Sequence, residues 1–289
     1  MGFNVGTLAT KWSIKGQAIN PVIFAEHYLQ RMSLVRPKKH LGQHFLTDEK
    51  IAEQITDALS FEGYKDVIEI GPGMGVLTYF LQEKVKGKIT LIEIDHESIA
   101  YLNENFKADN LTITEGDFLK MDLHEVAPEP AAIIGNFPYN ISSQILFKVF
   151  ESKPLIVEVV GMFQKEVAER ICSGPGKKAY GILSVLLQSC YDCDYLFTVN
   201  ETVFNPPPKV KSGVIRLRLN PSKKLKCDEA LFRKTVKTAF NQRRKTLRNA
   251  LKSFVPSVDI WNSLPYMDKR AEQLSWQQFE ELTLLIFAK

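Results

Sequence analysis

The chain has 289 residues, of which 45% are hydrophobic and 24% charged, which is typical of a globular protein and excludes a disordered one. No stretch reaches about eighteen uninterrupted apolar residues, and residues 1–31 lack the pattern of a signal peptide, so we expect a cytoplasmic protein with no membrane span. The net charge of +4 is unevenly placed, since residues 203–252 hold fifteen Lys and Arg but only two acidic residues.

Residues 1–31 are weakly patterned, and Met32 stands just before the basic run 36–40. We expect these residues to be either a flexible leader or the product of a start codon upstream of the true one. The sequence predicts that deletion of residues 1–31 leaves activity intact.

From residue 65, short apolar runs rich in β-branched residues alternate with helical patterns. The predicted strands are 66–70, 88–94, 111–115, 131–136 and 155–162. The predicted helices are 48–59, 75–86, 96–107, 141–151 and 164–173. The strands are almost continuously apolar, as expected for parallel strands covered on both faces. This alternation predicts an α/β fold with a doubly wound, mostly parallel sheet of Rossmann-like type.

Two further strands, at about 191–199 and 213–219, complete seven, and the turn-rich link between them suggests an antiparallel edge. The link contains three prolines, Pro206 to Pro208, which must be extended and stiff. Beyond about residue 222 the strand signal disappears, and 228–252 and 272–288 are patterned as amphipathic helices. We therefore place one domain, with the sheet, at 32–221 and a small all-α domain at 222–289.

Three glycines, Gly71, Gly73 and Gly75, follow the first strand of the sheet. Glycine at a βα turn lets the backbone approach a ligand, which in such sheets binds at the carboxyl ends of the strands. The dinucleotide pattern G-x-G-x-x-G is not met, because position 76 is valine, and this disfavours a nicotinamide dehydrogenase. A loop beneath a small nucleoside such as S-adenosylmethionine fits better, and a glycine-rich turn without a ligand is the alternative.

Acidic residues end the next two strands. Glu93 and Asp95 lie about twenty residues past the glycines, where a carboxylate can accept hydrogen bonds from both ribose hydroxyls. The spacing does not separate the two, and we prefer Glu93. After the third strand, Asp117 could accept a hydrogen bond from the adenine amine of the cofactor while Phe118 lines the base pocket. Both could instead be turn residues without a ligand.

The fourth strand ends in Asn136-Phe137-Pro138-Tyr139, the most informative feature of the chain. The exocyclic amine of adenine is a poor nucleophile, because its lone pair is delocalised into the ring. The Asn136 side-chain oxygen and the Phe137 carbonyl could hold that amine with its lone pair aimed at a sulfonium methyl. Pro138 stiffens the turn, and Tyr139 offers a face for stacking the target base, worth about 1–3 kcal/mol. The alternative is an ordinary strand-ending turn.

The four cysteines do not form a metal-binding pattern. Cys190 and Cys193 make a single C-x-x-C, without the second pair or the spaced histidines that a zinc site requires. We expect reduced thiols and no metal.

These motifs resemble the ribosomal RNA adenine dimethyltransferases, and most closely the group that acts on small-subunit rRNA. The matching segments are 39–46, 69–75, 92–95, 116–117, 135–142 and 204–217, in family order. The resemblance implies cofactor contacts at His44, Leu46, Gly71, Glu93, Asp117 and Asn136. Many members carry Asn where this chain has His44, and either residue can donate a hydrogen bond. The resemblance also implies that Phe204 sandwiches the target base opposite Tyr139.

The basic block supplies candidate RNA contacts. Arg243, Arg244, Lys245 and Arg248 lie on the predicted helix 228–252, and Arg216 and Arg218 come just before the second domain. These side chains would bind phosphates and set the register on folded RNA, and binding should then depend steeply on salt. A solvated helix face without a partner is the alternative.

The resemblance implies an enzyme that transfers methyl groups from S-adenosylmethionine to N6 of two adjacent adenosines near the 3′ end of small-subunit rRNA, in an immature 30S subunit. We expect it to be a monomer. The Pro-Pro-Pro-Lys-Val segment favours this group over the sister group that methylates large-subunit rRNA. A DNA adenine methyltransferase would share the chemistry, but usually carries Asp in place of Asn136 and a target-recognition insertion. A ribosome-assembly or transcription factor that kept the fold without catalysis is the third hypothesis.

Overall fold

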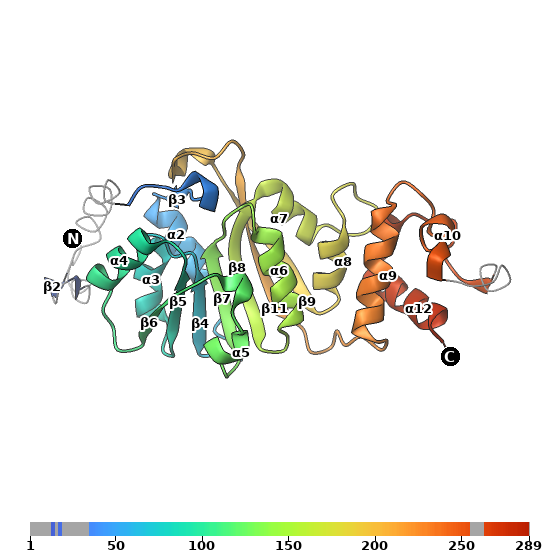
Figure 1. Ribbon diagram of the computed structural model, residues 1–289, viewed down its shortest axis with the longest axis horizontal. Coiled ribbons are helices and arrows are strands. Elements are labelled where there is room, and N and C mark those ends of the chain that lie inside the picture. Colours follow the sequence, from blue (N-terminus) through green and yellow to red (C-terminus); the bar gives the residue numbers. More distant parts are fainter. Residues whose placement is uncertain (1–12, 15–16, 19–34, 255–262, 289) are drawn as a thin grey trace, which may run out of the picture.

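The structure, a computed structural model, describes residues 13–14, 17–18, 35–254 and 263–288 (Figure 1). The leader predicted at 1–31 lies outside the described residues except for β1 (Ser13–Ile14) and β2 (Gln17–Ala18), which pair antiparallel. Among the described residues, no helix has the length and apolar character that a membrane crossing would need.

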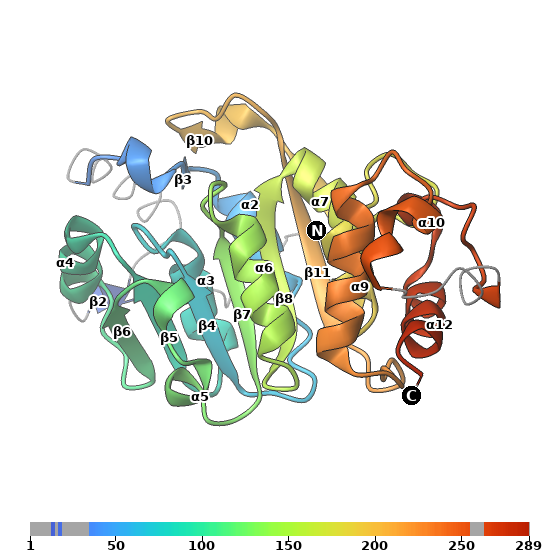
Figure 2. The same cartoon turned by 45° about the vertical axis from the view of Figure 1, so that its right-hand side comes forward.

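A seven-stranded sheet forms the centre of the molecule (Figure 2). Its strand order is β6-β5-β4-β7-β8-β11-β9, and the five strands from β6 to β8 are parallel. The strands are β4 (Asp66–Ile70), β5 (Ile89–Glu93), β6 (Leu111–Glu115), β7 (Ala131–Asn136), β8 (Ile156–Gln164), β9 (Tyr191–Val199) and β11 (Ser212–Leu219). The predicted mostly parallel, Rossmann-like sheet is confirmed, as is its antiparallel edge. Only β11 is reversed, and it lies between β8 and β9.

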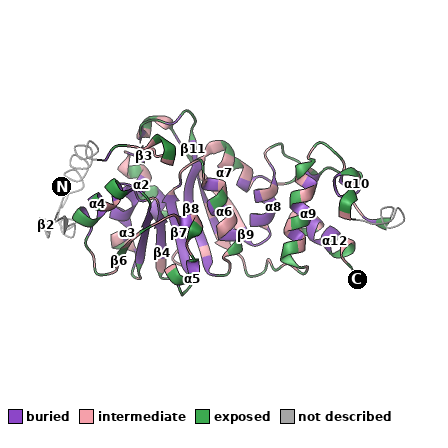
Figure 3. Cartoon of the chain, in the orientation of Figure 1, coloured by how far each residue is buried: buried purple, intermediate pink, exposed green. Residues whose placement is uncertain are grey.

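Two apolar clusters cover the two faces of the sheet. The central strands β4, β5, β7 and β8 are buried between them, whereas the edge strands β6 and β9 are partly exposed (Figure 3). One face carries α2 (Glu49–Asp57), α3 (Val76–Lys84) and α4 (His96–Asn105). The other face carries α5 (Leu123–Val126), α6 (Ser142–Glu151), α7 (Lys165–Cys172) and α8 (Ile182–Gln188). Burial on both faces explains why the strands are continuously apolar in sequence.

Helix α8 was not predicted from the sequence. Its residues Leu183 to Leu187 are all buried, so the helix has no polar face and no amphipathic period. A short helix that is apolar all round cannot be distinguished from a strand by its pattern.

The C-terminal helices extend the apolar cluster that begins on the sheet (Figure 1). They are α9 (Glu229–Asn241), α10 (Leu247–Ala250) and α12 (Trp276–Ile286). The ring of Phe240 bridges them to the rest of the chain, 6.3 Å from the ring centroid of Tyr180 and 6.0 Å from that of Phe279. The predicted all-α region is therefore present, and it shares one core with the sheet domain.

The prediction of one continuous helix over 228–252 was wrong. Helix α9 ends at Asn241, and Arg243 to Lys245 lie in a turn before α10. The chain turns there because the amide of Lys245 donates to the Gln242 carbonyl and Thr246 pairs with Arg270 in an antiparallel bridge. The second predicted helix, 272–288, is shorter because Ser275 caps the start of α12.

A second, two-stranded sheet joins segments far apart in sequence. Strand β3 (Phe45–Leu46) pairs antiparallel with β10 (Phe204–Asn205), and both lie above the main sheet in Figures 1 and 2. The amide and the hydroxyl of Thr47 both donate to the Val203 carbonyl, at 2.8 and 2.9 Å. This pairing brings the segment around His44 beside the proline-rich link.

Candidate active site

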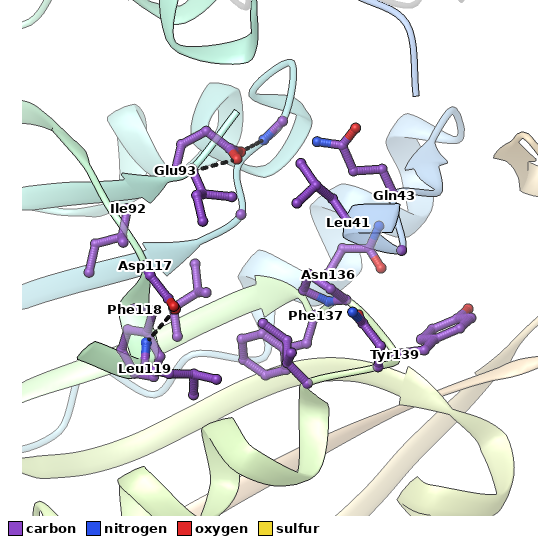
Figure 4. Close-up of a pocket in the computed structure, with 18 of the residues that line it drawn as sticks. Leu41, Gln43, Ile92, Glu93, Asp117, Phe118, Leu119, Asn136, Phe137 and Tyr139 are labelled. Atoms are coloured by element: carbon purple, nitrogen blue, oxygen red, sulfur yellow. Dashed lines mark hydrogen bonds between the residues drawn. The ribbon is translucent and has the colours of Figure 1, made fainter. Parts of the chain in front are cut away.

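A cavity of about 200 Å³ opens at the carboxyl ends of β4, β5, β6 and β7 (Figure 4). Five segments line it, within residues 40–45, 70–73, 92–94, 116–119 and 136–141. Most of the site residues predicted from the sequence are thus brought to one place, because parallel strands end at the same edge of a sheet.

The glycines after β4 serve two purposes. Gly71, Gly73 and Gly75 all have positive φ, between 57° and 77°. A Cβ on Gly71 would have no neighbour nearer than Pro138 Cδ at 3.9 Å, so this backbone is open to a ligand. A Cβ on Gly73 would lie only 2.8 Å from the ring of Phe45, and one on Gly75 would overlap the ring of Phe106. The latter two are therefore required for packing.

Glu93 lines the cavity at the end of β5. Its buried carboxylate accepts hydrogen bonds from the backbone amides of Gly73, Ile94 and Asp95 at 2.9–3.0 Å. Burial raises the pKa of Glu93, and these amides oppose that shift. The bonds fix the carboxylate beside the glycine turn.

Asp95, the alternative to Glu93, has a different position. It caps α4 through the amide of Glu97 and pairs with Lys38, and Gln43 donates to it at 3.3 Å. Burial acts to raise the pKa of Asp95, but the hydrogen bonds from Lys38 and Gln43 outweigh it and lower the pKa. Asp95 does not line the cavity, so the geometry favours Glu93 as the ligand and gives Asp95 the task of holding segment 38–43 over the site.

Asp117 and Phe118 lie together on the next strand end (Figure 4). Asp117 accepts a hydrogen bond from the amide of Leu119 at 3.0 Å and so caps a single 3₁₀ turn, Phe118–Lys120. The ring of Phe118 is 3% exposed, and the ammonium of Lys148 lies 5.2 Å from its centroid. This turn gives the cavity an apolar wall with one carboxylate on its rim.

Asn136 is oriented by the segment opposite. Its side-chain nitrogen donates to the His44 carbonyl at 2.8 Å, which leaves the side-chain oxygen as the free end of the amide. Among the described residues, no hydrogen bond is donated to that oxygen or to the Phe137 carbonyl. The two acceptors predicted from the sequence are therefore both available to an amine.

The ring of Phe137 anchors this turn in the core. It is 1% exposed and meets Phe163 edge to face, with centroids 5.0 Å apart. A Cβ on Gly135 would lie 2.7 Å from the ring, and one on Gly161 would overlap it. These two glycines belong to β7 and β8. Their role was not predicted from the sequence, because Gly161 comes under the ring only through the pairing of the two strands.

Tyr139 is held at both ends of its side chain. Its hydroxyl lies 2.6 Å from Ser212 Oγ, and its ring stacks on His44 with centroids 5.5 Å apart and an interplanar angle of 27°. Burial raises the pKa of Tyr139. Ser212 begins β11, so the main sheet fixes the orientation of this ring.

Leu46 and Phe204 do not line the cavity, in contrast to the positions that the resemblance implied. They pair with each other in β3 and β10 and are 1% and 4% exposed, in the cluster with Phe45. Their side chains face the core because both strands pack on the same cluster.

The six basic residues predicted to bind RNA differ in their surroundings. Arg244 and Lys245 are exposed and make no ion pair within the described part of the chain. Arg243 donates to the Glu272 carboxylate at 2.6 Å and to the Lys178 carbonyl, and Arg248 lies 3.9 Å from Asp268. The exposed turn after α9 is thus fixed to the body of the protein through Arg243.

Arg216 and Arg218 lie on β11, far along the chain from that turn. Both guanidinium groups approach Asp194 on β9, at 3.3 and 3.7 Å, and Arg216 also reaches the Ala58 carbonyl. Both residues are half-buried. Their positive charge is therefore partly balanced within the sheet.

Comparisons with known proteins identify the family. The sequence profile of the ribosomal RNA adenine dimethylase family matches residues 35–286. The chain is 57% identical over 259 residues to the ribosomal RNA small subunit methyltransferase A of Cytophaga hutchinsonii, which covers 89% of this chain and all of the relative. The corresponding protein of Parabacteroides distasonis is 56% identical over 254 residues, 88% of this chain and 95% of the relative. The chain belongs to the ribosomal RNA adenine dimethylase family.

Solved structures agree with this membership. A dimethyladenosine transferase from Plasmodium falciparum superimposes with a TM-score of 0.71 and 29% identity, over 85% of this chain and 98% of the other. The 23S rRNA methyltransferase ErmE superimposes with a TM-score of 0.64 at 24% identity, over 84% and 99%, and shows the same fold.

Family membership makes S-adenosylmethionine the methyl donor, and the cavity fits it. The open backbone at Gly71 is a cradle that a Cβ would fill, Glu93 offers a fixed carboxylate to a ribose diol, and Phe118 with Ile92 gives an apolar wall for a purine. No group of three or more His, Cys, Asp or Glu that could hold a metal ion exists among the described residues.

Proposed function

We propose that this dimethylase transfers methyl groups from S-adenosylmethionine to N6 of two adjacent adenosines near the 3′ end of small-subunit rRNA. The observation that carries this is the free acceptor pair, Asn136 Oδ1 and the Phe137 carbonyl, at the mouth of the cofactor cavity. The names of the relatives, which are small-subunit methyltransferases, support the choice of RNA.

The protein contributes position and polarity to the reaction. Asn136 and Phe137 accept hydrogen bonds from the target amine and favour a pyramidal nitrogen with its lone pair aimed at the methyl group. The bound cofactor supplies an electrophilic methyl on sulfur. No strong base is required, because the nitrogen becomes acidic as it is methylated, and the catalytic contribution is orientation together with fixed dipoles.

The cofactor is held by the residues that line the cavity. We assign the ribose hydroxyls to Glu93, the adenine amine to Asp117 and the adenine face to Phe118, with Gly71 and Gly73 beneath the methionine portion. The backbone of His44 completes this wall from the opposite segment, whereas Leu46 packs in the core. The hydrogen bonds of Glu93 and Asn136 support these roles, since both groups are fixed before a ligand arrives.

RNA phosphates are assigned to the basic residues of the second domain and of β11. Arg244 and Lys245 are free to contact phosphate, and Arg248 and Arg243 flank them on the same turn. Arg216 and Arg218 would act from β11, where Asp194 on the neighbouring strand β9 partly balances them. We expect the substrate to be an immature 30S subunit and the enzyme to act as a monomer in the cytoplasm. We also expect residues 32–221 to serve as the catalytic domain and residues 222–289 as the RNA-binding domain.

The proposal is tested by offering labelled S-adenosylmethionine with immature small subunits to the wild-type chain and to the Asn136→Ala variant. We expect label in dimethyladenosine at two adjacent positions with the wild type, and a loss of label with the variant. Equal labelling by both would contradict the mechanism. Labelling of free DNA but not of the subunit would contradict the choice of substrate.

A further inference from the structure

The side chain of Lys148 reaches from helix α6 to the turn that forms one wall of the cavity. Its ammonium donates hydrogen bonds to the Leu119 carbonyl at 3.2 Å and to the Met121 carbonyl, and it lies 5.2 Å from the centroid of the Phe118 ring. These partners belong to the 3₁₀ turn after β6 and to the residue that ends it. Among the described residues, neither carbonyl accepts another hydrogen bond, so Lys148 supplies the hydrogen bonds that join this turn to α6.

An ammonium group suits this position. The end of a short helical turn leaves carbonyls without a partner, and lysine has three donors and no acceptor, so one side chain can satisfy two of them. Burial lowers the pKa of Lys148. Three nearby carboxylates act to raise it, those of Asp117, Asp122 and Glu151. The cation is thus surrounded by acceptors that all lie on the turn, just after it, or on α6 itself.

The turn that Lys148 holds carries the groups assigned to the adenine of the cofactor. Asp117 caps its start by accepting a hydrogen bond from the Leu119 amide at 3.0 Å, while Lys148 binds the carbonyl of the same residue. Met121, the second partner of Lys148, packs on the residue before Asp117, because a Cβ on Gly116 would overlap its side chain. The backbone on both sides of Asp117 is therefore set by the segment that Lys148 holds.

The other end of α6 begins at the catalytic turn. The amide of Ile141 donates to the Pro138 carbonyl at 3.2 Å, and the hydroxyl of Ser142, the first residue of α6, donates to the Tyr139 carbonyl at 3.1 Å. Asp117 and Tyr139 lie on different sides of the cavity (Figure 4). One helix thus connects the wall assigned to the cofactor with the turn assigned to the target amine.

We propose that Lys148 is a positioning residue of the adenine subsite: by holding residues 117–121 to α6, it keeps the Asp117 carboxylate where it accepts a hydrogen bond from the adenine amine of the cofactor. This rests on the proposed function, which assigns that amine to Asp117. Lys148 does not line the cavity, so it acts through Asp117 and not by touching the cofactor. The enzyme's preference for a purine with a 6-amino group should then depend on Lys148.

Two substitutions and a matched control test this role. Lys148→Met keeps the length of the side chain but removes the ammonium, and Lys148→Arg keeps a cation that can donate to carbonyls. Lys153→Met is the control. The ammonium of Lys153 also donates to a carbonyl and lies over a ring, both of Phe150, at 2.9 and 3.6 Å, but it pairs with Glu229 and does not line the cavity. Thermal unfolding of each variant shows whether the fold is retained.

The probes are S-adenosylhomocysteine and its 6-deamino analogue, in which hydrogen replaces the adenine amine, and calorimetry without RNA gives the Kd of each. The wild type should bind the first roughly 10- to 100-fold more tightly, the range for one hydrogen bond to a charged group. Lys148→Met should reduce this ratio to below about five, and Lys148→Arg should restore most of it. Lys153→Met should keep the wild-type ratio, even if it lowers the Tm.

A double-mutant cycle shows whether Lys148 acts through Asp117. Asp117→Asn should also reduce the ratio, because its single side-chain oxygen is used to cap the turn. Adding Lys148→Met to Asp117→Asn should then change the ratio by less than about twofold. In methyl transfer to small subunits, the KM of Lys148→Met for S-adenosylmethionine should rise roughly 5- to 50-fold, with kcat within about threefold of the wild type.

Several results would overturn the inference. A wild type that binds both probes equally, or a Lys148→Met variant that keeps the wild-type ratio, would separate Lys148 from recognition of the amine. Additive losses in the cycle would show that Lys148 does not act through Asp117. A fall in kcat with an unchanged ratio would assign Lys148 to the catalytic turn. By contrast, failure of the wild type to methylate small subunits, with the expected ratios, would overturn the choice of RNA and support the role of Lys148.

Discussion

The ring of Phe137 lies directly against the backbone of Gly161 on the neighbouring strand, with no space for a Cβ between them. Phe137 carries one of the two acceptors proposed for the target amine, so the position of that carbonyl depends on a glycine that is not itself in the cavity. The catalytic turn is thus set by the packing of β7 on β8.

Replacing Gly161 with alanine should therefore displace the turn. We expect Gly161→Ala to lower the free energy of unfolding by about 1–3 kcal/mol, as overpacking in a core does, and to lower kcat as well. Gly174→Ala is the matched control, because a Cβ there would meet nothing within 4 Å. Urea unfolding and methyl transfer by both variants provide the measurement. A Gly161→Ala variant as stable and active as the control would contradict the packing argument.

Two substitutions of Asn136 should distinguish the contribution of its side-chain oxygen, an acceptor, from that of its side-chain nitrogen, a donor. Asn136→Ala removes both and should reduce kcat roughly 10²- to 10³-fold, by analogy with the loss of one fixed polar group at a transition state. Asn136→Asp retains an acceptor but loses the donor to the His44 carbonyl, so it should keep more activity than the alanine variant. Single-turnover methyl transfer distinguishes the two. Equal losses would show that the hydrogen bond to His44 matters more than the acceptor.

The neighbours Arg243 and Arg244 should respond differently to alanine. Arg243 is tied to Glu272 and Lys178, so Arg243→Ala should cost about 1–2 kcal/mol of stability. Arg244→Ala should change the free energy of unfolding by less than about 0.5 kcal/mol. It should weaken binding of the subunit and reduce by about one the slope of the logarithm of the binding constant against the logarithm of the salt concentration. Chemical unfolding and binding titrations at several salt concentrations give both quantities. A stability loss at Arg244 equal to that at Arg243 would refute the distinction.

Glu69 should make stability depend on pH. Burial raises the pKa of Glu69 to about 8, against the hydrogen bond from Thr78 and with a further rise from the nearby Glu93. Because the folded pKa lies above the unfolded value of 4.5, the folded state binds the extra proton, and the free energy of unfolding falls as pH rises from about 4.5 to about 8. Glu69→Gln should remove this fall and gain stability relative to the wild type as pH increases.

Urea unfolding between pH 5 and pH 9 measures the difference for Glu69→Gln, with Glu62→Gln as the control at an exposed position. We expect the control to follow the wild type at every pH. The same pH slope in all three proteins would show that Glu69 titrates normally in the folded chain.

Several features could be predicted from the sequence because they depend on local patterns. Continuous apolar runs separated by amphipathic segments indicated the parallel sheet, and glycines, acids and the Asn136 turn at strand ends indicated one cavity. The carboxyl ends of parallel strands lie at the same edge of a sheet, irrespective of the conformation of the loops. The positions of Gly71, Glu93, Asp117 and Asn136 in the sequence were therefore sufficient to predict that they lie close together.

Other features depended on contacts between segments distant in sequence, for which local pattern carries no information. The pairing of β3 with β10 buries Leu46 and Phe204 and places His44 on Tyr139, although about 160 residues separate the paired strands. The same holds for Gly161 beneath Phe137, and for the bridge between Thr246 and Arg270 that ends α9 early. The sequence by itself determined the chemistry at the strand ends, and the tertiary structure decided which side chains face it, because burial and stacking are set by neighbours that only folding brings together.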